Sequence, residues 1–89
     1  MPLPSTLAEA VAHILSEMSL DDKRLVRETK REDLIKFHFG WGMGIRNALG
    51  LWSGNDALLR SACCEGLCHP DDASMKIIEA VWVELQKDL

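Results

Sequence analysis

Three cysteines and a histidine lie within seven residues, and this is the set of side chains most suited to metal chemistry. Cys63, Cys64, Cys68 and His69 carry thiol and imidazole groups of the types that bind zinc. Zinc sites usually join two separated pairs of ligands, however, and the chain has no second pair elsewhere. The spacing from Cys64 to His69 is also one residue longer than the c-type haem attachment motif. We therefore expect free thiols here, with neither metal nor haem bound.

A cysteine nucleophile would require a base and an orienting group beside its thiol. His69 follows Cys68 directly, but so near a neighbour need not point at the sulfur. The chain contains neither a Gly-x-Ser-x-Gly turn nor a His-Glu-x-x-His helix. We expect no enzyme activity, no catalytic residue and no cofactor.

The stretch over residues 38–52 combines glycine, tryptophan and an Arg46–Asn47 pair inside an otherwise apolar run. Arginine is seldom buried without a partner, because an unpaired buried charge is strongly destabilising. Asp71 and Asp72, just before the last predicted helix, are the expected partners. A bidentate contact with Arg46 would anchor the start of that helix.

Two interpretations of these polar residues are open. In the first, a purely structural network ties the loops to the helices; its members are Arg46, Asn47, Asn55, His69 and Asp71. In the second, the same residues form a site for a ligand or a partner, together with nearby aromatic side chains and a half-buried His38. The candidate binding residues are His38, Trp41, Arg46, Asn47, Trp52, Asn55, His69, Asp71 and Asp72.

Composition limits the class of protein. The 89 residues, 47% hydrophobic and 27% charged, are typical of one globular domain over residues 1–89. A net charge of −4 and a pI near 5.2 argue against nucleic-acid binding, which usually needs a basic face. No apolar run approaches the roughly 20 residues that cross a bilayer, and the N-terminus shows no secretion signal. With the odd cysteine count, this predicts a soluble protein of the reducing cytoplasm.

Apolar residues recur at helical spacing through most of the chain, and no window shows the alternation of a strand. Helices are predicted over about residues 7–18, 20–28, 56–63 and 73–87. The longest helical pattern opens at Thr29 and ends at Gly50, with Leu34, Trp41 and Ile45 on one face. We expect an all-α fold, a small single-domain bundle of four to five short helices.

Short polar motifs mark the expected helix starts. Thr6 and Thr29 each begin a capping box, in which a hydroxyl caps the first turn and a glutamate three residues later reaches back. Ser19 precedes two aspartates and predicts another cap. The last helix is expected to be capped by Asp71 or Asp72.

The glycines of the longest predicted helix need a compensating role. A glycine inside a helix costs roughly 1 kcal/mol relative to alanine. Gly40 and Gly44 are four residues apart and would share one face. We expect that face to let another helix approach closely; a kink or a break near Gly42 is the alternative.

A basic stripe runs from Lys23 to Arg31 and includes Arg27 and Lys30. Acidic residues are interleaved with it and would cancel most of its electrostatic field. A solvated face is therefore favoured over a phosphate-binding surface.

Two longer motifs carry a family resemblance. They are His38-Phe-Gly-x-Gly-Met-x-Ile-Arg-Asn-x-x-Gly-Leu-Trp-x-x-Asn55 and His69-Pro-Asp-Asp-x-Ser74. Together with the amphipathic helix that contains Trp82, they make the chain from Thr6 to Leu85 resemble DUF6794, a family of small, mostly bacterial domains of unknown function. The resemblance implies no reaction, and it leaves the cysteines outside the motif. The motif positions that it implies are His38, Arg46, Asn47, Trp52, Asn55, Pro70, Asp71 and Ser74.

We expect a non-catalytic protein–protein interaction module, because tryptophan and arginine are residue types that anchor interfaces. Trp41 and Trp52 need not both fit in so small a core, and an exposed aromatic patch would bind another protein or a second copy of the chain. The alternative is a small anionic-ligand or nucleic-acid binding domain that uses Arg46, His38 and the basic stripe from Lys23 to Arg31. A membrane is not expected as a partner.

Overall fold

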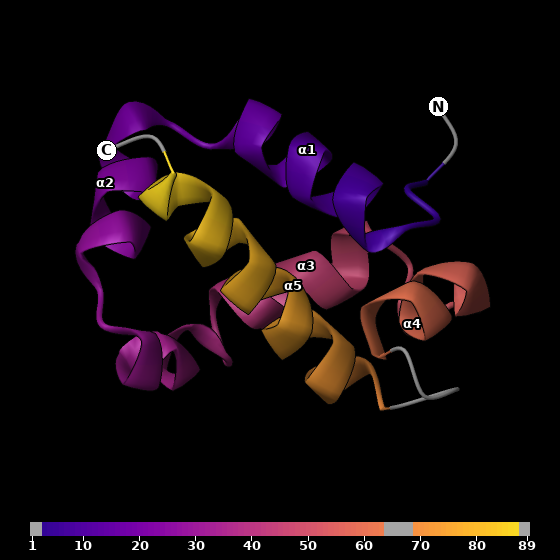
Figure 1. The fold of residues 1–89 in the computed structure, drawn as a ribbon. Coiled ribbons are helices and arrows are strands. Elements are labelled where there is room, and N and C mark those ends of the chain that lie inside the picture. The colour runs from indigo at the N-terminus through magenta and orange to yellow at the C-terminus, as the bar shows by residue number, and fades with distance from the viewer. Residues whose placement is uncertain (1–2, 64–68, 88–89) are drawn as a thin grey trace.

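Helices make up all the regular structure in residues 3–63 and 69–87, the part of the chain that the computed structural model describes. The elements are α1 (Leu7–Glu17), α2 (Leu20–Glu28), the 3₁₀ helix η1 (Arg31–Phe37), α3 (Trp41–Ala48), α4 (Asp56–Cys63) and α5 (Pro70–Gln86) (Figure 1). The all-α prediction is confirmed, and the expected four to five helices become six. None of these helices is long and apolar enough to cross a membrane.

Helix α5 is the centre of the fold. Each of the other five helices packs against it, and Figure 1 shows it crossing over α3 in the middle of the molecule. The side chains of Ile77, Ile78 and Val81 on α5 are completely buried. Full burial of such a side chain stabilises a fold by roughly 1.5–3 kcal/mol. The apolar stripe of this one helix therefore organises the core.

The first two predicted caps are confirmed. The Thr6 hydroxyl accepts from the backbone N–H of Glu9 at 3.1 Å, and the Ser19 hydroxyl accepts from that of Asp22 at 3.1 Å. The Glu9 carboxylate reaches back and accepts from the backbone N–H of Ser5 at 3.1 Å and from its hydroxyl at 3.0 Å. These hydrogen bonds from Ser5 lower the pKa of Glu9 below its ordinary value.

The third predicted cap and the long helix behind it are wrong. The Thr29 hydroxyl donates to the Leu25 carbonyl at 2.7 Å, so it closes α2 instead of opening a new helix. The chain then forms η1, turns at residues 38–40 and begins α3 at Trp41. The break has a local reason, because the His38 carbonyl accepts a hydrogen bond from the Arg46 guanidinium at 3.2 Å.

The glycine that packs closely is Gly42, not Gly40 or Gly44. A Cβ atom added at Gly42 would lie 3.2 Å from Nη1 of Arg46 and 3.3 Å from the Phe37 carbonyl oxygen. At Gly40 and Gly44 such an atom would meet no described residue within 4 Å. The prediction that Gly40 and Gly44 receive another helix of the chain is therefore wrong, and their face of α3 is open.

The connection from α3 to α4 follows the predicted signals. Gly50 ends the helical pattern with φ of 71°, a left-handed conformation that glycine adopts without steric cost. Asn55 caps α4 by accepting from the Leu58 backbone N–H at 3.4 Å. Its amide nitrogen also donates to the carbonyls of Pro4 and Leu49, at 2.9 and 2.8 Å. Asn55 thus ties the start of the chain to the α3–α4 turn.

The start of α5 differs from the prediction. His69 is its cap, and Nδ1 of His69 accepts from the Asp71 backbone N–H at 3.1 Å. Pro70 takes the first helical position, where its missing N–H is not needed. The helix therefore begins three residues before the predicted start at residue 73, and neither Asp71 nor Asp72 is the cap.

The cysteine cluster is described only at its first member. Cys63 ends α4 and is disulfide-bonded, which corrects the expectation of a free thiol at this position. Cys64 and Cys68 lie outside the described residues, and so does most of the predicted loop between Cys63 and Pro70.

Candidate functional site

Arg46 joins α3 to the first turn of α5. Its side chain is only 4% exposed, and Nη1 donates to the Ser74 hydroxyl at 2.8 Å. Nε lies 3.3 Å from Oδ1 of Asp71, which confirms Asp71 as the ion-pair partner, but the predicted bidentate contact is not formed and this Nε makes no hydrogen bond among the described residues. Asp72, the other predicted partner, is exposed. A charge buried this deeply requires both the carboxylate and the surrounding oxygens.

Ser74 is the buried hydrogen-bond partner of Arg46 on α5. It is fully buried, and its hydroxyl donates to the Asp71 carbonyl at 2.9 Å while accepting from Arg46. The guanidinium also fills the space beside Gly42, where a larger residue would displace it. Arg46 and Ser74 therefore fix the position of Asp71 at the start of α5.

The imidazoles of two histidines lie near Oδ2 of Asp71, the carboxylate oxygen that Arg46 does not contact. Nε2 of His38 is 3.9 Å from Oδ2, and Nδ1 of His69 is 3.6 Å from the same atom. His38 is half-buried, as expected, but its Nδ1 has no hydrogen-bond partner among the described residues. The contact of the His38 ring with Asp71 is thus longer than a hydrogen bond.

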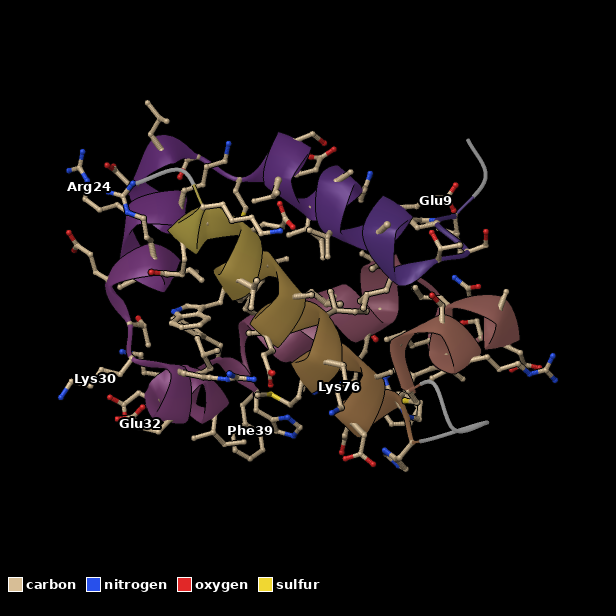
Figure 2. The ribbon with its side chains drawn as sticks, in the orientation of Figure 1. Glu9, Arg24, Lys30, Glu32, Phe39 and Lys76 are labelled. Carbon is tan, nitrogen blue, oxygen red and sulfur yellow. The ribbon has the colours of Figure 1, made fainter. Side chains whose placement is uncertain are left out.

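Aromatic rings extend this group at both ends. The Phe39 ring lies edge-on to His38 with centroids 5.0 Å apart, and the Trp52 ring lies edge-on to His69 at 5.4 Å. Phe39 is 79% exposed and Trp52 is 54% exposed. Figure 2 shows the labelled Phe39 side chain pointing away from the helices. We call the row of Phe39, His38, Asp71, His69 and Trp52 the Asp71 surface.

Nearly the whole chain matches the model of a known protein family. Residues 3–85 match the model of the family described as Domain of unknown function (DUF6794). The chain belongs to this family. Searches of curated proteins and of solved structures gave no match.

The motif positions that the resemblance implied meet in part. In this DUF6794 domain, His38, Arg46, Asp71 and Ser74 form one connected group. Asn55 lies apart from that group and braces the chain start instead. These motif residues therefore support two separate parts of the fold.

Three further predicted site residues have other surroundings. Trp41 is half-buried at the start of α3, with its ring edge-on to Phe37 at a centroid distance of 5.7 Å. Asn47 and Asp72 are exposed and take no part in the contacts around Arg46. The network predicted from Arg46, Asn47, Asn55, His69 and Asp71 thus loses its two asparagines.

Two members of the arrangement were not among the predicted site residues. Ser74 is a motif position, but a serine inside a helix gives no signal of the arginine that it binds. Phe39 precedes a glycine and falls within the single long helix that the sequence predicts. The alternative drawn from the glycines, a break near Gly42, is close to the turn observed at residues 38–40, and it is this turn that exposes Phe39.

The donor set does not match a metal centre in the described part of the DUF6794 domain. No group of three histidine, cysteine, aspartate or glutamate side chains there could hold a metal ion. At the Asp71 surface itself, Nδ1 of His69 already accepts the hydrogen bond of the Asp71 amide, which occupies the lone pair a metal would need.

Proposed function

We propose that this DUF6794 domain is a non-catalytic interaction module that binds another protein, or a second copy of itself, through the Asp71 surface. The observation that carries the proposal is the exposure of Phe39 and Trp52 at the two ends of one row of contacts. Exposed aromatic rings around a fixed polar centre are typical of the residues that contribute most to interface affinity.

The rigidity of the polar centre supports this role. Asp71 is half-exposed, yet Arg46 contacts its carboxylate from inside the fold. A side chain that is already held loses little conformational freedom on binding, so a partner gains more from the contact. The two imidazoles add hydrogen-bonding groups between the aromatic rings.

The same contacts disfavour catalysis by this group of residues. A hydrolytic nucleophile must be accessible and paired with a base. The Ser74 hydroxyl is fully buried and engaged with Arg46 and Asp71. The proposal therefore assigns no reaction to the Asp71 surface.

The alternative, an anionic-ligand or nucleic-acid binding domain, has less support. Arg46 is 4% exposed and its charge faces Asp71, so little of its field reaches solvent. In the basic stripe, Arg31 forms an ion pair with Glu79. This alternative predicts binding that weakens steeply with salt, whereas binding through aromatic rings is nearly indifferent to salt.

The test compares the wild type with a Phe39→Ala/Trp52→Ala double variant in affinity capture from the native cell extract, with quantitative mass spectrometry. Leu20→Ala is the matched control, because Leu20 on α2 is 80% exposed and lies outside the Asp71 surface. For at least one protein that the wild type and the control both capture, the double variant should capture an amount lower by about tenfold or more. Native mass spectrometry of the purified chain would reveal a homodimer.

The proposal fails if two results are found together. The double variant captures the same proteins in the same amounts as the wild type, and the wild type, the double variant and the Leu20→Ala control are all monomers. A small ligand retained in the native mass spectrum, and lost in high salt, would support the anionic-ligand alternative instead.

The compartment is a separate part of the proposal. The cytoplasm was predicted from the composition, but disulfides such as that of Cys63 persist mainly in oxidising compartments. Alkylation of thiols in intact cells distinguishes the cytoplasm from an oxidising compartment. Rapid labelling of Cys63 would support the cytoplasm, and labelling only after reduction would oppose it.

A further inference from the structure

A second surface, separate from the Asp71 surface, is a groove between α1 and α3. It has a volume of about 430 Å³, and we call it the Trp41 groove. Its floor is apolar and is formed by Ile14, Met18, Trp41 and Ile45. Met18 and Trp41 also line a neighbouring hollow of about 250 Å³ beside α2, so apolar surface continues from one into the other.

One wall of the groove is formed by small residues. Gly44 and Ala48 of α3 line it, and both are exposed. A Cβ atom at Gly44 would meet nothing within 4 Å, so no other part of the described chain covers this wall. The distance between packed helices depends on the side chains at their contact, and small residues allow the shortest separations.

The charged side chains along the groove are two carboxylates, and the one other titratable group that lines it is the imidazole of His13. Glu17 and Asp22 line it and are exposed, and neither forms an ion pair with a described residue. No lysine or arginine lines the groove or the neighbouring hollow. A cation placed at this rim would face two free carboxylates, and such complementarity selects the partner.

We propose that the Trp41 groove binds a basic amphipathic helix of a partner protein. Apolar side chains at helical spacing on the partner would lie on Trp41 and Met18, with its backbone close to Gly44. Lysine or arginine residues at the edge of that apolar face would pair with Glu17 and Asp22. This inference does not depend on the role of the Asp71 surface.

The test uses two synthetic 18-residue helical peptides with the same leucine stripe. One carries lysine at all polar positions, and the other carries glutamate. Fluorescence anisotropy of labelled peptide, titrated with the full chain, should show the lysine peptide binding at least about tenfold more tightly than the glutamate peptide. Equal affinity for the two peptides would overturn the proposal.

Two variants place the binding in the groove. Gly44→Leu places a bulky side chain on the wall formed by Gly44 and Ala48, where a Cβ atom would meet no described residue within 4 Å, and it should weaken lysine-peptide binding about tenfold or more. Glu17→Lys reverses a rim charge at the C-terminal end of α1, where a cation also favours the helix dipole, and should reduce the peptide preference. Met43→Ala, an exposed α3 residue that does not line the groove, is the control.

Circular dichroism confirms that each variant is folded before its affinity is measured. A folded Gly44→Leu variant with unchanged peptide affinity would place the binding elsewhere and refute the groove. Sedimentation of the chain alone covers the other occupant: a dimer that Gly44→Leu dissociates would mean that a second copy, rather than a basic partner helix, fills the groove.

Discussion

A guanidinium buried as deeply as that of Arg46 depends on the oxygens around it. Arg46→Met should lower the free energy of unfolding by about 2–4 kcal/mol, because the Ser74 hydroxyl and the His38 carbonyl lose their donor. Urea denaturation measures the change. Arg60→Met is the matched control, since Arg60 is exposed, and it should change stability by less than about 0.5 kcal/mol. Equal effects of the two substitutions would contradict the assignment.

Two glycines on α3 give opposite expectations for the same substitution. Gly44→Ala should raise the free energy of unfolding by about 0.5–1 kcal/mol, because the added methyl group meets nothing and alanine favours the helix. Gly42→Ala should lower it by about 1–3 kcal/mol, because the methyl group would crowd Arg46 and the Phe37 carbonyl. Thermal unfolding of the two variants measures both; a rise in stability for Gly42→Ala would show that the contact is not tight.

Charge made one part of the site predictable from the sequence. A buried arginine needs a carboxylate, and Asp71 opens the helix that the α3 pattern had to pack against. Helical spacing, in contrast, selected Gly40 and Gly44, whereas the close contact is at Gly42. The turn at residues 38–40 changes the orientation of the helix that follows it. As a result Gly42, and not Gly40 or Gly44, lies against the guanidinium of Arg46.

At the scale of the elements, the two asparagines differ in what they contact. Asn55 connects the chain start to the α3–α4 turn, whereas Asn47 is exposed. Asn55→Ala should lower the free energy of unfolding by about 2 kcal/mol, since it removes the α4 cap and the donors to Pro4 and Leu49. Asn47→Ala, at an exposed position, should have little effect. Chemical denaturation tests the pair, and a harmless Asn55→Ala would remove the brace from the account.

Local signals predicted most of the helix boundaries. Hydroxyls at Thr6 and Ser19, the glycine at position 50 and Asn55 each act within a few residues of their own position. The long predicted helix failed for a different reason. Leu34 and Ile45 fit one helical face, but the His38 carbonyl bonds to a side chain instead of continuing the helix. Periodicity contains no information on that contact.

At the scale of the whole molecule, the packing of five helices on α5 predicts cooperative unfolding. Ile77→Ala should lower the free energy of unfolding by about 2–5 kcal/mol, because Ile77 is fully buried. Far-UV circular dichroism and tryptophan fluorescence should still report one coincident transition. Val83→Ala on the exposed face of the same helix should change stability by less than about 0.5 kcal/mol. Separate transitions in the two signals would mean that some helices fold without α5.

The central position of α5 also bears on how the protein is made. The ribosome synthesises α1 to α4 before α5, so their apolar faces have no central helix to pack against until the last of these elements emerges. The nascent chain therefore exposes apolar surface until α5 has been synthesised, a state that is prone to aggregation and is normally protected by chaperones. Formation of the native core thus waits for the synthesis of α5, and a ribosome stalled before α5 would hold an unfolded chain.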